Sequence, residues 1–407
     1  MTSPTWSNEL GSGSAVGSES GDLGWLREIV VELLQTPTQV PQGQTELAPG
    51  DENIKRAVND VVVPMIEQLQ PDEIRVHPDG DVAARFGPVG DCGLLMQTYV
   101  VSQHANLMSA ESAGRVVPIH GDSLMDASVS GQGATQNKGA MASALLAVRR
   151  RPEDLRQPIW LTVNTEGKSS HAGSSRILDD LEVKAAAGIL TVGTGLRVSL
   201  GNRGRADARV TITGLSAHSS QPWLGHNPIA DAADVLVALR TAPLPQDHEF
   251  LGPVALTPYQ VWCEPVSPHT IPEFTNLQLD RRLLPGESPV AAVDGIRAHL
   301  QECLPDISAT VEAGEVMLPA VVDADAPVVA ALTDGLRAET GQPGETFWSL
   351  NTFDAGYACS KGIPTVMFGP GDRHFSGPGL LDEDAVSFRD LWTGAAVYNH
   401  VIAQLCA

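Results

Sequence analysis

The chain has 407 residues, and 49 acidic against 26 basic residues give it a formal net charge of −23 at pH 7. This length exceeds one ordinary hydrophobic core and predicts two domains. An acidic chain lacks the basic surface that nucleic-acid binding requires, so we expect no nucleic-acid partner.

The five cysteines are scattered along the chain and none forms a Cys-x-x-Cys pair. This spacing predicts neither a disulfide framework nor a thiolate zinc site. The sequence also has no run of about eighteen apolar residues and no basic-then-apolar leader. These features together predict a cytoplasmic protein without a membrane partner.

The first half of the chain predicts an α/β domain after a polar tail. Residues 1–21 are rich in Ser, Gly, Thr and Asn, which predicts disorder. Apolar runs and helical periodicity then alternate, as expected for a mostly parallel sheet covered by helices. The expected helices are 23–34, 53–69, 140–148 and 174–187, and the expected strands are 82–86, 93–101, 158–163 and 189–192.

The pattern changes near Asn202, where alternating polar and apolar residues predict half-buried strands. Strands are expected at 206–213, 276–284 and 308–315, with helices at 228–240 and 289–302. This order predicts a small α+β domain with an antiparallel sheet, inserted at 204–316 as a lid or dimerisation domain. The main domain is then discontinuous and comprises residues 22–203 and 317–407.

Polar residues follow the apolar strands of the main domain, including the run 363–368. In open α/β sheets, ligands collect outside the carboxyl ends of the parallel strands. We therefore expect one cleft with the side chains of His104, Asn106, Gln136, Asn164, Thr165, Glu166 and His374 around it.

Several motifs occur in one order along the chain. They are Gly131-x-Gly133-Ala134-x-x-x-Lys138-Gly139, Glu166-Gly167, Gly214-x-x-Ala217-His218, Asp280-Arg281-Arg282 and Phe368-Gly369-Pro370-Gly371. In this order they resemble the di-zinc amide hydrolase and metallopeptidase family of aminoacylase, acetylornithine deacetylase, succinyl-diaminopimelate desuccinylase and carboxypeptidase G. The resemblance implies a zinc-exopeptidase-like main domain, an inserted lid and a homodimer.

The chain departs from this family at the positions that hold zinc. His104-Ala105-Asn106 stands where the family has His-x-Asp, and Gln136 stands at the position of the bridging aspartate. Thr165 and Glu166 stand for the paired glutamates, and Thr194 lies where a further acidic ligand is expected. Two adjacent zinc ions need anionic ligands, and a threonine hydroxyl is no general base. We therefore expect no cofactor, or at most one zinc held by His104, Glu166 and His374.

A second stretch offers an alternative register. His120-Gly121-Asp122 has the family's letters, but no apolar strand precedes it and it lies close to Gln136 in the sequence. If it is the true motif, the chain is an ordinary zinc-dependent amide hydrolase or dipeptidase.

Each candidate residue also has a plain structural interpretation. His104 could be a buried strand-end histidine, Gln136 a helix-capping or surface residue, and Glu166 a partner of Lys138 or Arg176. The resemblance implies that His218 reaches a partner subunit's cleft, whereas local capping near Ser220 is the alternative. Arg282 either binds a ligand carboxylate bidentately or forms an ion pair inside the lid.

The residues favour an enzyme that acts on an amino-acid- or peptide-derived small molecule through acid–base chemistry. Glu166, His104, His218 and Thr165 are the candidate catalytic residues. Asn106, Gln136, Arg282, Asn164 and His374 are the candidate ligand-binding residues. The alternative is a non-catalytic descendant that binds a ligand or a partner.

Overall fold

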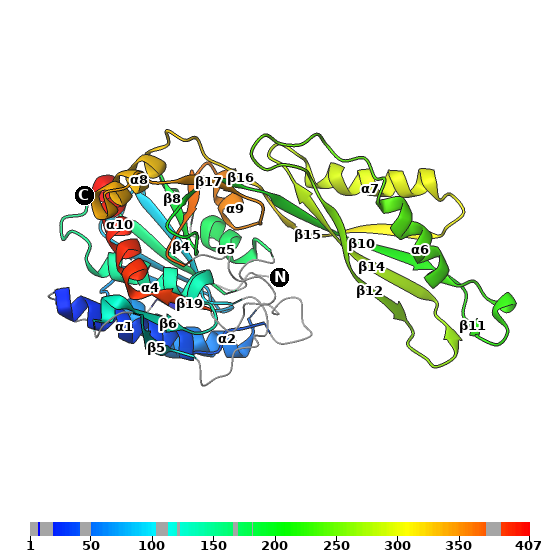
Figure 1. Cartoon of the computed structure of the whole chain (residues 1–407), viewed down its shortest axis with the longest axis horizontal. Helices are drawn as coiled ribbons and strands as arrows, with labels where there is room; N and C mark the ends of the chain where they lie inside the picture. The colour runs from blue at the N-terminus through cyan, green and yellow to red at the C-terminus, as the bar shows by residue number, and fades with distance from the viewer. Residues whose placement is uncertain are drawn as a thin grey trace. The chain divides into compact units, whose positions relative to one another are not determined.

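The computed structural model describes residues 7–8, 19–40, 50–102, 113–119, 123–165, 170–180, 182–371 and 384–407. The chain divides into two compact units (Figure 1). The first comprises Met1–Gly201, Val321–Phe347 and Tyr357–Ala407, and the second comprises Asn202–Ala320 and Trp348–Gly356.

The first unit is built on a seven-stranded sheet of order β1-β2-β3-β7-β4-β8-β18. Its strands are β1 (Ser7–Asn8), β2 (Glu73–Val76), β3 (Val82–Phe86), β4 (Leu94–Tyr99), β7 (Ile159–Asn164), β8 (Gly188–Thr191) and β18 (Thr365–Phe368). Strands β7, β4, β8 and β18 are mutually parallel, while β3 pairs antiparallel with β2 and β7. The α/β class is confirmed, and the sheet is mixed: it is parallel from β7 to β18 and antiparallel from β1 to β7.

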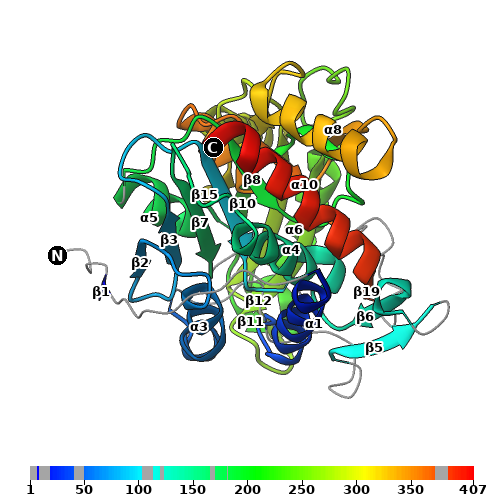
Figure 2. The same ribbon diagram turned by 90° about the vertical axis from the view of Figure 1, so that its left-hand side faces the viewer.

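Helices cover both faces of this sheet (Figure 2). Leu94, Met96 and Leu161 belong to the core cluster that includes α4 (Gly139–Arg149) and α10 (Phe388–Cys406). Leu95 and Trp160 alternate with them and pack with α5 (Ala172–Asp180). Since both faces are buried, β4 and β7 read as continuous apolar runs, which is why the sequence predicted them.

The remaining elements of the first unit surround this core. They are α1 (Glu19–Gln35), α2 (Glu52–Ala57), η1 (Val58–Val62), α3 (Val63–Glu67), η3 (Leu124–Asp126), η4 (Ala134–Lys138) and α8 (Pro327–Thr340), with the small sheet β19 (Ala385–Ser387), β6 (Ala127–Ser130) and β5 (Arg115–Pro118). Among the described residues, no helix combines the length and the apolar character needed to cross a membrane.

Two local predictions for this unit were wrong at their bounds, and one predicted helix has a local irregularity. Helix α1 begins at Glu19, inside the stretch expected to be disordered. The expected helix 53–69 contains the π-helical segment η1, because Pro64 has no N–H and its ring excludes an ordinary helical turn before it. Helix α5 ends at Asp180 rather than at 187, since Glu182 has a left-handed φ of 49°.

The second unit is a four-stranded antiparallel sheet with two helices on one face (Figure 1). The sheet order is β12 (Leu256–Glu264), β14 (Phe274–Leu283), β10 (Gly204–Thr213) and β15 (Ala309–Met317). Alternate residues of β10, such as Ala208 and Val210, pack with Val235 and Ile296 of α6 (Pro228–Leu239) and α7 (Pro289–Cys303). Both helices begin at an Asn or Ser cap followed by Pro, a usual start signal.

The short elements of the chain complete the description. The second unit also holds the pair β11 (Ala217–His218) and β13 (Thr270–Ile271) and the turn η5 (Pro222–Leu224). Elements β9 (Val198–Asn202), β16 (Ala320–Val321), β17 (Thr346–Ser349) and α9 (Ala355–Ser360) lie where the chain passes between the units.

Candidate functional site

Hydrogen bonds join the loops at the carboxyl ends of the parallel strands. After β8, the Gly193 amide donates to the Gln136 carbonyl at 3.1 Å. The Gly195 amide donates to the Gly371 carbonyl, in the loop after β18, at 2.9 Å. A Cβ at position 193 would lie 1.8 Å from the Thr135 carbonyl oxygen, so only glycine permits this approach. The loops after β8 and β18 and the segment η4 therefore form one edge, as the strand pattern predicted.

A buried carboxylate fixes the end of β7. The backbone amide and the hydroxyl of Thr165 each donate to Oδ1 of Asp81 at 2.8 Å. Arg176 Nε donates to the other oxygen of Asp81 at 2.6 Å, and Asp81 is fully buried. Arg176 therefore has a carboxylate partner in Asp81, and the Thr165 hydroxyl proton anchors the strand end. A catalytic role of Thr165 stays a prediction.

Asn164, which precedes Thr165 and ends β7, belongs to a small network of polar side chains. Asn164 is buried, and its Nδ2 donates to the hydroxyl of Ser174 on α5 at 3.0 Å. Gln97 of β4 donates to the same hydroxyl at 3.3 Å. These contacts hold Asn164 beneath the cleft edge, and its predicted ligand contact is not tested by them.

The segment that carries Gln136 is held by an acidic residue from the far end of the chain. Asp384 accepts hydrogen bonds from the Gly133 amide at 2.7 Å and from the amide and hydroxyl of Thr135, both at 2.8 Å. Asn137 Nδ2 donates to the carbonyls of the β4 end, Tyr99 at 2.9 Å and Val101 at 3.1 Å. Gln136 is nine-tenths buried, so it is not a surface residue.

Lys138 ends this segment and is almost completely buried, with 2% exposure. Its Nζ donates to the Thr36 carbonyl at 2.7 Å. Burial lowers the pKa of the ammonium group from 10.5 to about 7, and the carboxylate of Asp384 opposes this shift. The motif spacing contains no signal for this contact between Lys138 and Thr36.

Several candidate residues lie outside the described residues. These are His104, Asn106, Glu166 and His374, together with His120 and Asp122 of the alternative motif. Three of them come shortly after a described strand in the sequence. His104 is two residues after Ser102, Glu166 directly follows Thr165, and His374 is three residues after Gly371. Within the described ranges, no group of three or more His, Cys, Asp or Glu side chains is arranged to hold a metal ion.

The resemblance places three described side chains, those of Gln136, Thr165 and Thr194, at the family's carboxylate positions. Gln136 and Thr165 are neutral, and the Thr165 hydroxyl is bonded to Asp81. The Thr194 hydroxyl donates to the Arg197 carbonyl at 2.7 Å and accepts from the Gly369 amide at 3.2 Å. None of the three offers the anionic oxygen that a pair of zinc ions needs, so these residues do not fit a two-zinc centre.

The second unit holds two neighbouring guanidinium groups. Arg282 donates to Oδ2 of Asp280 and to the hydroxyl of Thr352, both at 2.8 Å, so the predicted lid ion pair is present. Arg203 is nine-tenths buried, and its Nε donates to the Leu251 carbonyl at 3.0 Å. Burial lowers the pKa of Arg203, and the charge of Arg282 lowers it further. Arg203 was not among the predicted site residues, because its position before Gly204 gives no periodic signal.

His218 lies on β11 and its side chain is exposed. Its Nδ1 lies 2.8 Å from the hydroxyl of Ser220 and accepts from the Ser220 amide at 3.2 Å. The local capping contact that the sequence analysis gave as an alternative is therefore present. A catalytic role across a dimer is not tested by a single chain.

Comparisons with known proteins agree with this architecture. Residues 200–307 match the family model described as the M20 peptidase dimerisation domain. The chain is 25% identical over 342 residues to a succinyl-diaminopimelate desuccinylase of Rhodospirillum centenum, covering 78% of this chain and 83% of that protein. It is 27% identical over 266 residues to an uncharacterized Escherichia coli protein, covering 60% of this chain and 66% of that protein.

Solved structures share the fold at lower identity. A tripeptidase from Staphylococcus aureus superposes with a TM-score of 0.71 at 16% identity, covering 94% of this chain and 98% of that one. The M20 metallo-carboxypeptidase Sso-CP2 from Sulfolobus solfataricus superposes with a TM-score of 0.68 at 15% identity, covering 93% and 98%.

An α/β main unit interrupted by a small dimerisation domain defines the class, a hydrolase fold of the metallopeptidase type. The chain is similar to members of the M20 peptidase family, and it matches the family's dimerisation-domain model over residues 200–307. The resemblance drawn from the sequence motifs is thus confirmed.

Proposed function

We propose that the chain is an M20-type enzyme that acts on an amino-acid- or peptide-derived small molecule by acid–base chemistry without the two-zinc centre. One observation carries the proposal. The Asp81 carboxylate fixes both polar groups of Thr165 at the end of β7, and Glu166 is the next residue. The resemblance implies four carboxylate positions, at Gln136, Thr165, Glu166 and Thr194. Glu166 is the one of these four residues that has an ionisable side chain.

The remaining roles follow from side-chain chemistry. A carboxylate at a strand end can take a proton from one atom of the substrate and return it to another. His104, His218 and His374 are further proton carriers, and the amides of Asn106, Gln136 and Asn164 can hydrogen-bond the substrate. Arg282, with Arg203 beside it, suits a substrate carboxylate, because guanidinium groups bind carboxylates bidentately. If a metal is present, we propose one zinc on His104, Glu166 and His374.

The test combines metal analysis with one conservative variant. Protein purified without added metal is expected to contain at most one zinc per chain by elemental analysis. In a screen of N-acyl amino acids and dipeptides, Glu166→Gln is expected to lower turnover at least about a hundredfold, because it removes the ionisable group and keeps its shape. Glu28→Gln on the exposed side of α1 is the control for losing a glutamate.

Three outcomes would contradict the proposal. Close to two zincs per chain would restore the ordinary zinc hydrolase. Full activity of Glu166→Gln together with inactive His120→Ala or Asp122→Ala would identify His120-Gly121-Asp122 as the true motif. No turnover of any compound, with tight binding of one, would favour the non-catalytic alternative.

The second unit also supports a homodimer. Strand β12 is at the edge of its sheet, and it exposes Tyr259 and Val261 at 47% and 62%. Helix α6 exposes Ile229 and Val237 at 49% and 60%. An edge strand with apolar side chains is a template for pairing with another chain, and the matched domain is described as a dimerisation domain. We propose that two copies pair through this unit.

Light scattering is therefore expected to give the mass of two chains at micromolar concentration. Val261→Lys places a charge on the edge strand and is expected to shift the protein toward one chain. Val290→Lys, at an equally exposed valine of α7, is the matched control and is expected to leave the mass unchanged. A wild-type protein with the mass of a single chain would refute the dimer.

A further inference from the structure

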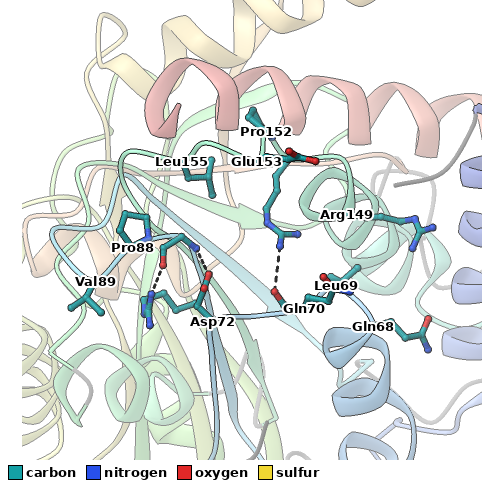
Figure 3. Close-up of a pocket in the computed structure, with 13 residues that line it drawn as sticks. Gln68, Leu69, Gln70, Asp72, Pro88, Val89, Arg149, Pro152, Glu153 and Leu155 are labelled. Atoms are coloured by element: carbon teal, nitrogen blue, oxygen red, sulfur yellow. Dashed lines mark hydrogen bonds between the residues drawn. The ribbon is translucent and has the colours of Figure 1, made fainter. Parts of the chain in front are cut away.

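The first unit has a cavity of about 970 Å³ away from the candidate cleft (Figure 3). Its walls come from the end of α3 and the residues after it, the turn that follows β3 at Gly87, and the segment between α4 and β7 that includes Leu155. Since β3 runs antiparallel to β7, these walls lie at the amino end of β7. The candidate cleft lies at the carboxyl end of the same strand.

Three arginines line the cavity, and two of them form ion pairs with carboxylates. Arg85 pairs with Glu73 at 3.1 Å and Arg149 pairs with Asp22 at 3.2 Å. Arg151 has no carboxylate within ion-pair distance among the described residues. Among the three arginines of this wall, Arg151 is therefore the one whose positive charge has no ion-pair partner within the described residues.

Hydrogen bonds hold Arg151 in place without using all of its donors. It donates to the Val148 carbonyl at 2.9 Å and to the Gln70 carbonyl at 3.3 Å, and it lies over the Phe86 ring at 4.7 Å. A guanidinium group has five N–H donors, so several remain. Burial lowers the pKa of Arg151 and Asp72 opposes this shift, which means that the buried charge is only partly compensated.

Asp72 supplies an opposite charge on the same wall. Its Oδ2 accepts a hydrogen bond from the Gly87 amide at 2.7 Å, and within the described residues Asp72 forms no ion pair. An anion alone would be repelled by Asp72 and by the exposed Glu153. A ligand with both charges avoids this repulsion. Leu155 and Pro88 add apolar surface for a side chain.

We propose that this cavity binds a zwitterionic amino acid or short peptide, with its carboxylate on Arg151 and its ammonium group on Asp72. The apolar wall accepts a side chain of moderate size. This second site is separate from the proposed reaction, because its residues lie at the other end of β7 and binding to it can be measured without turnover.

Calorimetric titration of the full chain with three probes tests the site. Leucine carries both charges, N-acetylleucine lacks the ammonium group and leucinamide lacks the carboxylate. Leucine is expected to bind, and each of the other two is expected to bind at least about tenfold more weakly, because each loses one charge-assisted contact.

Two variants locate the binding. Arg151→Gln is expected to weaken leucine binding at least about tenfold, whereas Arg240→Gln, an exposed arginine of the second unit, leaves it unchanged. Since Arg151 also holds the end of α4, Asp72→Asn is the second variant. It is expected to weaken leucine binding and to leave N-acetylleucine binding unchanged. Absence of leucine binding, or equal binding by the wild type and both pocket variants, would overturn the proposal and leave Arg151 as a helix-capping residue.

Discussion

Asp81→Ala is expected to lower the free energy of unfolding by about 3–5 kcal/mol, the usual cost of removing one partner of a buried ion pair. The variant leaves the Arg176 guanidinium without its fully buried partner. It also leaves the amide and hydroxyl of Thr165 without their acceptor. Urea denaturation followed by circular dichroism measures the loss.

Two further variants test this explanation. Asp79→Ala removes a half-exposed carboxylate 3.8 Å from the same arginine, so it is expected to cost less than about 1 kcal/mol. Asp81→Ala combined with Arg176→Met is expected to cost less than Asp81→Ala alone, because the charge that Asp81 balances is removed together with it. A loss below about 1 kcal/mol for Asp81→Ala would mean that Asp81 does not hold the strand end.

The central strands could be predicted from the sequence because a strand buried on both faces has a continuous run of apolar residues. Strands β4, β7, β8 and β18 are short apolar runs bounded by polar residues, and this pattern survives without tertiary information. Strand β12 has no such run, since it is an exposed edge strand containing Pro258. The prediction that the helix continues beyond Asp180 was wrong although its sequence signal was present. Its periodicity continued, but the backbone at Glu182 turns to positive φ.

The sequence predicts where the candidate site lies, but it does not predict the hydrogen bonds that hold the elements of the site in place. The motif spacing placed Gln136 and Thr165 at one edge of the sheet, and the structure joins the elements that carry them. The carboxylates that hold these elements lie far away in the chain. Asp81 is 84 residues from Thr165, and Asp384 is 249 residues from Thr135. Periodicity reports local structure, so it contains no signal for such pairs.

Lys138 is expected to make the stability of the protein rise as pH increases from about 7 toward 9. Above about pH 9 the buried thiols of Cys92 and Cys406, whose pKa values burial raises to about 12, act in the opposite direction. Burial lowers the pKa of Lys138 in the folded chain to about 7, against 10.5 for an exposed lysine. Below pH 7 the lysine is charged in both states, and the full cost of burying the charge is present. Between these two values the unfolded chain keeps its proton and the folded chain does not. Stability therefore increases with pH, by up to about 1.4 kcal/mol per pH unit.

Lys138→Met is expected to abolish this part of the pH dependence, because methionine fills a similar volume without a titratable group. The variant also loses the hydrogen bond to the Thr36 carbonyl, so the diagnostic quantity is the slope of unfolding free energy against pH rather than its value at one pH. Lys184→Met, at an exposed lysine, is the control for losing a positive charge. Urea denaturation at intervals from pH 6.5 to pH 9.5 spans the lower part of the window.

Parallel profiles for the wild type and Lys138→Met would show that Lys138 keeps its proton in the folded chain. Asp384, which already accepts three hydrogen bonds from Gly133 and Thr135, would then have to compensate the buried charge across the segment that carries Gln136.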